Sequence, residues 1–137
     1  MLVVTTAAFL WLLHQPAAAT PDEPYFKNWG TYIEVQGQWA NIRTGKQLGN
    51  LVSVRAWPRE RYLEVIEINR DAPKLLITSS LFKIIRWDTN EIRSAEEGLI
   101  KKMIRIDLKT KSAEMSEAEH DGTRSKYLLS TGGRAPF

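Results

Sequence analysis

Apolar and polar residues alternate with a period of two along most of the chain after residue 29. The segment 31–35, TYIEV, places Ile33 and Val35 on one face, with Tyr32 and Glu34 on the other. The segment 51–57, LVSVRAW, alternates in the same way and is followed by a proline. Because successive side chains of a strand point to opposite faces, this pattern predicts β-strands.

Further strand candidates follow, separated by turn residues. The segment 61–70, RYLEVIEINR, is rich in β-branched and aromatic residues, as strands are, and has apolar residues on both faces. We expect it to be covered on two sides. The segment 75–87, LLITSSLFKIIRW, predicts one bent strand or two short ones, with Ser79 and Ser80 at the bend. The segment 103–115 predicts a hairpin, and 121–131 a turn followed by a strand.

The segment 90–104 fits two patterns. At helical spacing, Asn90 is a plausible N-cap for an apolar face. That face comprises Ile92, Ala95, Leu99, Ile100, Met103 and Ile104. In the alternative, residues 88–90 turn the chain and Gly98 turns it again between two strands. We favour strands, because a glycine inside a helix costs about 1 kcal/mol relative to alanine.

The strand candidates recur about every 8 to 12 residues with turns between them, a spacing typical of antiparallel barrels and sandwiches. We predict an all-β fold, either a small antiparallel barrel or a strongly curved β-meander. An α+β fold with a helix near residues 90–104 is the alternative. The 137-residue chain, 43% apolar, fits one domain with a modest core. We place that domain at 29–131, after an exposed lead-in at 20–28 and before a polar tail at 132–137.

The N-terminal segment differs from the rest of the chain. Residues 1–13 are uncharged and nearly all apolar, and alanines occupy 17–19. This order predicts a secretory signal peptide, residues 1–19, cleaved after Ala19. A membrane anchor and a buried core helix are the alternatives, but a bilayer-spanning helix needs about 20 apolar residues. We therefore expect export from a bacterial-type cell, a periplasmic or secreted location, and no stable membrane span after cleavage.

Composition excludes several kinds of chemistry. The chain has no cysteine, so it forms no disulfide and has no thiol nucleophile. The net charge is +3, and the excess of basic residues lies in residues 99–137, where acidic residues interleave with them. Nucleic-acid binding usually requires a clustered basic face. We therefore expect no nucleic-acid partner.

The acidic residues and the one remaining histidine offer weak candidates for catalysis or metal binding. After cleavage only His120 is left, in a polar stretch where a general base would lack a fixed orientation. Its neighbours Glu117, Glu119 and Asp121 carry oxygen ligands, but there is no second histidine and no calcium-loop motif. We expect no metal site, and predict solvated side chains here.

The adjacent pair Glu96–Glu97 is the other acidic candidate. Neighbouring residues of a strand point to opposite faces, so these two carboxylates would not converge on a substrate. We therefore expect a protein that is not an enzyme, with no catalytic residues and no cofactor.

Tryptophan is the enriched residue type: all but Trp11 lie after the predicted cleavage site. For Trp39 and Trp87 we favour a place in the core over a place in a ligand pocket. Trp57 lies among Arg55, Arg59 and Arg61, and arginine and tryptophan are over-represented at binding hot spots. Arginine also stacks on aromatic rings. Residues 55–61 are therefore the predicted contact surface.

The triplet Gly37-Gln38-Trp39 resembles the Gly-x-Trp at the first strand of lipocalins. It also resembles a Gly-x-Trp found early in small periplasmic protease inhibitors of the metalloprotease-inhibitor barrel family. The resemblance covers three residues. The alternation alone places Gly37 and Trp39 on the inward face of a strand. We therefore interpret Gly37 as a position where the strand can bend and Trp39 as an inward-facing residue.

We therefore predict a non-enzymatic binding or interaction domain with an unknown protein partner. The resemblance implies two alternatives: a carrier of a small apolar ligand inside a lipocalin-like barrel, and a periplasmic inhibitor of a hydrolase.

Overall fold

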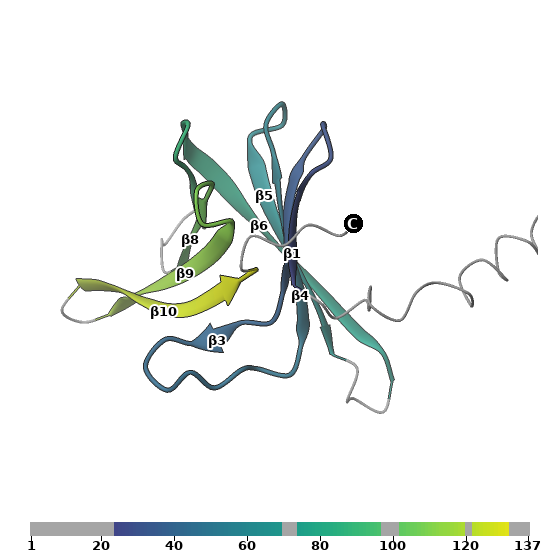
Figure 1. Ribbon diagram of the computed structural model, residues 1–137, viewed down its shortest axis with the longest axis vertical. Helices are drawn as coiled ribbons and strands as arrows, with labels where there is room; N and C mark the ends of the chain where they lie inside the picture. Colours follow the sequence, from purple (N-terminus) through teal and green to yellow (C-terminus); the bar gives the residue numbers. More distant parts are fainter. Residues whose placement is uncertain (1–23, 70–73, 97–101, 120–121, 132–137) are drawn as a thin grey trace, which may run out of the picture.

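Ten antiparallel strands form one continuous, curled sheet in the computed structural model (Figure 1). The structure describes residues 24–69, 74–96, 102–119 and 122–131. The strands are β1 (Tyr25–Asn28), β2 (Ile33–Gly37), β3 (Ala40–Asn41), β4 (Leu51–Trp57), β5 (Tyr62–Asn69), β6 (Leu76–Trp87), β7 (Glu91–Ala95), β8 (Lys102–Asp107), β9 (Ser112–Glu119) and β10 (Gly122–Ser130). The described residues contain no helix. The prediction of an all-β antiparallel fold is confirmed.

The strands form a meander that curls into a half-barrel. Their order is β1-β2-β4-β5-β6-β7-β8-β9-β10-β3. Only Gln38 and Trp39 separate β2, which pairs with β1 and β4, from β3, which pairs with β10. The chain therefore bends at Gly37–Trp39 and links the first part of the meander to the last, so that β2 and β10 approach each other.

The core lies on the inner face of the curled sheet, as alternation along the strands requires. Val35, Val54 and Val65 are register partners across β2, β4 and β5, and all three are buried. The opposite half contributes Ile104, Ile106, Ala113 and Leu129, among others. Trp39 is 2% exposed and belongs to this core, as predicted, while Trp87 is half-buried and packs against it.

Gly37 lies where the two ends of the meander meet. A Cβ at this position would lie 3.2 Å from Leu129 Cδ2 and 3.2 Å from Pro24 Cβ. Both contacts are tighter than ordinary van der Waals contact, and Leu129 is fully buried. The glycine therefore allows β10 to pack closely against the end of β2.

We expect Gly37→Val to lower the free energy of unfolding by about 1–2 kcal/mol, because overpacking a filled core forces neighbouring side chains to move. Urea denaturation of the purified variant measures this cost. In a Leu129→Ala background the valine would have room, so the same substitution should cost less or stabilise. An equal cost in both backgrounds would show that contact with Leu129 is not the cause.

Two parts of the fold, β1 and the bend of β6, differ from what the sequence predicts, whereas the strands favoured for residues 90–104 are confirmed where the structure describes them. Residues 25–28 form β1 rather than an exposed lead-in, because Phe26 packs against the core beside its register partner Val35. The helix alternative is wrong for residues 90–96 and 102–104, which lie in the turn before β7, in β7 and in β8, while Gly98 lies outside the described residues. β6 is one strand, and its register shifts between Ile84 and Arg86 rather than at the two serines.

The outer face of β5 is also more open than predicted. Leu63 and Val65 are buried on the inner face, but Ile66 and Ile68 on the outer face are only half-buried. In the described part of the chain, no second layer covers this face.

Several predictions fall on residues outside the described ranges. These are the signal peptide at 1–19, the polar tail at 132–137, and His120 with Asp121. In the part of the chain that the structure describes, no helix is both long and apolar enough to cross a membrane.

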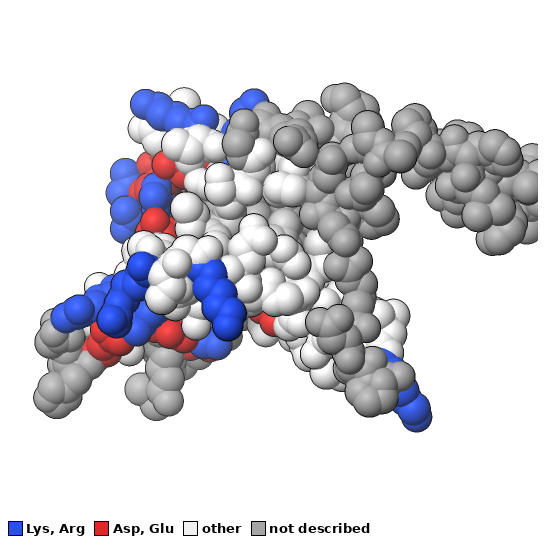
Figure 2. Space-filling view, turned by 60° about the horizontal axis from the view of Figure 1, so that its bottom comes forward, with Lys and Arg blue, Asp and Glu red and all other residues white. Residues whose placement is uncertain are grey.

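Charged and uncharged side chains are unevenly distributed over the surface. Figure 2 shows lysines and arginines interleaved with acidic residues on one side of the molecule, beside a broad uncharged area. The interleaving agrees with the sequence pattern of the last third of the chain.

Candidate functional site

Four aromatic side chains form a row at one end of the outer face. Trp29 and Tyr32 lie between β1 and β2, Trp57 ends β4, and Tyr62 begins β5. The ring centroids are 6.2 Å apart for Trp29–Tyr32, 4.5 Å for Tyr32–Trp57 and 6.0 Å for Trp57–Tyr62, with interplanar angles of 20–27°. Trp57 and Tyr62 are also register partners. We call Trp29, Tyr32, Trp57 and Tyr62 the aromatic row.

The buried carboxylate of Glu34 contacts this row. Glu34 is 2% exposed although it lies on the outer face of β2. Its Oε1 accepts hydrogen bonds from the Tyr25 hydroxyl at 2.7 Å and from Trp29 Nε1 at 2.9 Å. Its Oε2 accepts one from the Ser53 hydroxyl and forms an ion pair with Arg55 Nε at 3.3 Å. The carboxylate thus fixes side chains from β1, β4 and the β1–β2 turn.

The pKa of Glu34 reflects two opposing effects. Burial alone would raise it, but hydrogen bonds from Ser53, Tyr25 and Trp29 and the charge of Arg55 outweigh burial and lower the pKa. The pKa of Tyr25 is raised by burial and by its hydrogen bond to the Glu34 carboxylate. Both shifts keep Glu34 ionised and Tyr25 a donor near neutral pH.

Cations flank the aromatic row. Lys27 Nζ lies 4.2 Å from the centroid of Trp29, and the guanidinium carbon of Arg55 lies 5.4 Å from the centroid of Tyr32. Both distances are within the range of cation–π attraction. Arg55 therefore contacts both the Glu34 carboxylate and the Tyr32 ring.

An open pocket of about 470 Å³ begins where the aromatic row ends at Tyr62. It is lined by Glu60, Arg61, Tyr62, Leu81, Phe82 and Lys83. Lys83 is the register partner of Tyr62, and the neighbouring residue Leu81 is 64% exposed. Arg61 holds a left-handed backbone, with φ 59°, in the turn between β4 and β5. The pocket lining therefore combines two aromatic residues, an exposed aliphatic side chain, two cations and one carboxylate.

The structure brings three of the six predicted site residues together. Trp57 lies inside the aromatic row, Arg55 lies beside it, and Arg61 lines the pocket. Arg59 is exposed in the same turn. Trp39 and Trp87 are not part of this site, because they pack in or against the core.

Trp57 is held differently from the predicted rim residue. Tyr32, from the β1–β2 turn, and Tyr62, from β5, both stack on it, so its ring neighbours are aromatic rather than arginine. Its indole Nε1 is buried and has no hydrogen-bond partner among the described residues. The Trp57 ring is therefore held in a fixed orientation at the surface.

Sequence reasoning missed Glu34, the two tyrosines of the row and Lys83. The sequence did contain a signal for two of these residues. In residues 31–35 a tyrosine and a glutamate alternate with the apolar residues, so they lie on the face opposite the core. Polar side chains on the outer face of a strand are usually exposed to solvent. Only the register that places Glu34 beside Ser53 and Arg55 shows that it is enclosed.

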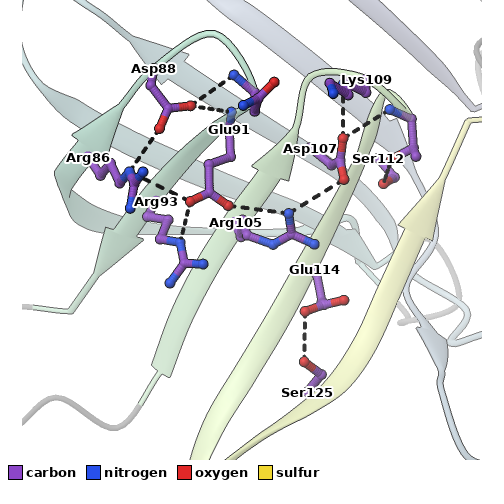
Figure 3. A network of polar contacts seen from close by, with 12 residues as sticks. Arg86, Asp88, Glu91, Arg93, Arg105, Asp107, Lys109, Ser112, Glu114 and Ser125 are labelled. Atoms are coloured by element: carbon purple, nitrogen blue, oxygen red, sulfur yellow. Dashed lines mark hydrogen bonds and ion pairs between the residues drawn. The ribbon is translucent and has the colours of Figure 1, made fainter.

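A second polar network covers the outer face of the other half of the sheet (Figure 3). Arg86, Arg93 and Arg105 are register partners across β6, β7 and β8, an arrangement of like charges that is unfavourable alone. Glu91 offsets it, with its carboxylate 3.8 Å from Arg86 Nε, 2.7 Å from Arg93 Nε and 3.4 Å from Arg105 Nη1. The network ties three strands together.

Two turn aspartates complete this network. Backbone N–H groups of Asn90 and Glu91, with Arg86, lower the pKa of Asp88. The backbone N–H of Thr110, then that of Lys109, and the charge of Arg105 lower the pKa of Asp107. Each arginine of the network faces a carboxylate, so we interpret it as structural.

Within the described ranges, no three histidine or acidic side chains are grouped so as to hold a metal ion. Comparison of the chain with protein-family models, with curated proteins and with solved structures finds no match.

Proposed function

We propose that the protein is a non-enzymatic binding domain, exported to the periplasm or secreted, whose contact surface is the outer face around the aromatic row and its pocket. The observation that carries this proposal is the pocket beside Tyr62, in which exposed Leu81 lies next to Arg61 and Lys83. Aromatic and arginine side chains dominate binding energy at protein interfaces. We define the contact surface as Trp57, Arg61, Tyr62, Leu81 and Lys83.

Rigidity supports this assignment. A binding surface loses less entropy on association when its side chains are already fixed. The stacking of Trp57 between Tyr32 and Tyr62 fixes the aromatic part of this surface before any partner arrives. The four contacts made by Glu34 fix the side chains beside it, Trp29 and Arg55 among them.

The charges suggest the chemistry of the partner. Arg61 and Lys83 flank the apolar part of the pocket, and Glu60 is the one carboxylate in its lining. A protein segment with an aromatic or aliphatic side chain next to an acidic one would match both the apolar lining and the excess positive charge.

A carrier role has weaker support. A ligand inside the barrel needs empty space in front of Trp39, and the inner face around it is packed with buried side chains. The outer pocket is the larger of the open spaces described, with about 470 Å³ against about 210 Å³ for one lined by Arg93, Arg105 and Glu114, among others.

The double variant Arg61→Asn and Lys83→Glu tests the proposal. Asparagine tolerates the left-handed backbone of position 61, and both side chains are exposed, so the fold should survive. We expect partners captured from a cell-envelope extract by the wild-type protein to bind the double variant at least about tenfold more weakly.

Ile42→Ser is the matched control, because Ile42 is an exposed apolar residue outside the contact surface. It should leave capture unchanged, with circular dichroism confirming the fold of each variant. Equal capture by the wild type and the double variant would contradict the proposed surface.

A further inference from the structure

The first half of β6 is an open sheet edge. β5 pairs with β6 along its length from Leu76 to Lys83, but β7 pairs with β6 only from Lys83 onward. In the described residues, no strand lies on the other side of Leu76–Phe82. Beyond Ala95 the last described pairing of the β7–β8 hairpin is within the hairpin, with Glu96 N–H donating to the Lys102 carbonyl at 3.2 Å.

The register shows which backbone groups face the open edge. Ile84 N–H donates to the Arg61 carbonyl, just before β5, at 3.1 Å, so Ile84 faces β5. Hydrogen-bonding direction alternates along a strand, and the β5–β6 register is uninterrupted. Ile77, Ser79 and Leu81 therefore direct their N–H and C=O groups away from β5, toward the open edge.

The usual protections against edge pairing are missing within residues 75–82, and Lys74 and Lys83 flank this segment. Exposed edges in natural proteins carry lysines, prolines, bulges or inward-pointing charges. Residues 75–82, LLITSSLF, contain no charge and no proline, and the register shift of β6 lies beyond them. Leu76, Ile77 and Leu81 are 53%, 56% and 64% exposed. An uncharged, apolar, unpaired edge of this kind is a template for another strand.

We propose that this edge binds the same edge of a second copy of the chain, forming an antiparallel β6–β6 pair about a two-fold axis at Ser79. This inference shares Leu81 with the proposed contact surface, but it is argued from the backbone edge and does not rest on the proposed function. In this register Ile77 lies opposite Leu81 of the second copy, Ser79 lies opposite its own counterpart, and Leu81 lies opposite Ile77. All three are residues whose backbone groups face the edge, so each pair exchanges two hydrogen bonds.

Self-complementarity selects a second copy over an unrelated peptide. Two-fold pairing places the segment opposite itself, so each of its residues must suit another residue of the same segment. The segment is neutral, and its apolar residues fall opposite each other at the edge-facing positions. On the outer face the Ile77–Leu81 pairs extend an apolar strip that already contains Ile68 and Leu51, which are register partners.

A charge-swap experiment tests both the dimer and its register. Analytical ultracentrifugation of the purified protein should show a concentration-dependent dimer. Ile77→Glu and Leu81→Lys, each alone, place a charge opposite an apolar residue twice per dimer, and we expect each to weaken dimerisation at least about tenfold. Mixed in equal amounts, they should form a heterodimer, because the introduced glutamate of one copy then faces the introduced lysine of the other and the second pair stays apolar.

Controls separate pairing from misfolding. Ile85→Glu introduces the same charge at an exposed position of β6 where β7 is already paired, and should leave the dimer intact. Ser79→Pro removes an edge-facing N–H and the 3.5 Å side-chain hydrogen bond to Glu64, but no backbone hydrogen bond to β5, and should also abolish the dimer. A wild type that is monomeric at all concentrations, variants that dimerise normally, or a mixture that stays monomeric would each overturn the proposal.

Discussion

Replacing Trp39 with alanine should lower the free energy of unfolding by about 3–5 kcal/mol, the usual cost of truncating a buried aromatic side chain to alanine. Trp39 is 2% exposed and lies at the bend between β2 and β3. Its backbone carbonyl also accepts a hydrogen bond from Leu48 N–H at 2.8 Å. A cavity at this bend would loosen the link between β3 and the rest of the core. Urea denaturation, followed by circular dichroism, measures the loss.

Two further variants test the cause. Ile85→Ala removes an exposed apolar side chain and should change stability by less than about 0.5 kcal/mol. Trp39→Phe should cost less than Trp39→Ala, because it keeps most of the ring and removes an indole N–H that has no acceptor among the described residues. If Trp39→Ala costs no more than Ile85→Ala, the tryptophan does not fill the core.

The alternation of side chains was sufficient to predict most of the strands, though not β1 or β3, and the direction of Trp39. Val52, Val54 and Ala56 alternate with polar or amphipathic neighbours, and they are the buried residues of β4 on the core side. The inward parity of Ile33 and Val35 continues through Gly37 to Trp39. These features follow from local geometry, which a sequence carries directly.

Features that depend on which strands meet were not predicted. Residues 25–28 were predicted as part of a lead-in because prolines at 21 and 24 and several polar residues surround Phe26, although Phe26 packs against the core. The aromatic row joins Trp29 and Tyr32, in the β1–β2 turn, to Trp57 in β4 and Tyr62 in β5. Arg55 and Trp57 were identified as site residues from composition alone, whereas Glu34 required the register between β2 and β4. Pairwise register is a long-range property, and no local pattern specifies it here.

Replacing Glu34 with glutamine should lower the free energy of unfolding by about 2–3 kcal/mol at neutral pH, within the range for loss of hydrogen bonds to a charged group. One glutamine oxygen can still accept from Tyr25 and Trp29. The amide nitrogen would then face the Ser53 hydroxyl, which can rotate, and the Arg55 guanidinium, which can only donate. Arg55 is about one-third exposed, so water relieves part of its lost ion pair. Tryptophan emission should also shift, because Trp29 loses a charged acceptor.

The pH dependence of that loss is the sharper test. Because the pKa of Glu34 is lowered in the folded protein, the unfolded chain binds the proton more readily. The stabilisation from Glu34 is therefore fully present above about pH 4.3, the ordinary pKa of glutamate, and is lost as the pH falls through the lower folded value. Asp88 and Asp107 have lowered pKa values too, but they are present in both proteins and cancel in the comparison. The stability gap between wild type and Glu34→Gln should consequently be constant near neutral pH and narrow in acid. A gap that stays constant or widens below about pH 4.3 would show that the carboxylate does not hold the aromatic row in place through its charge.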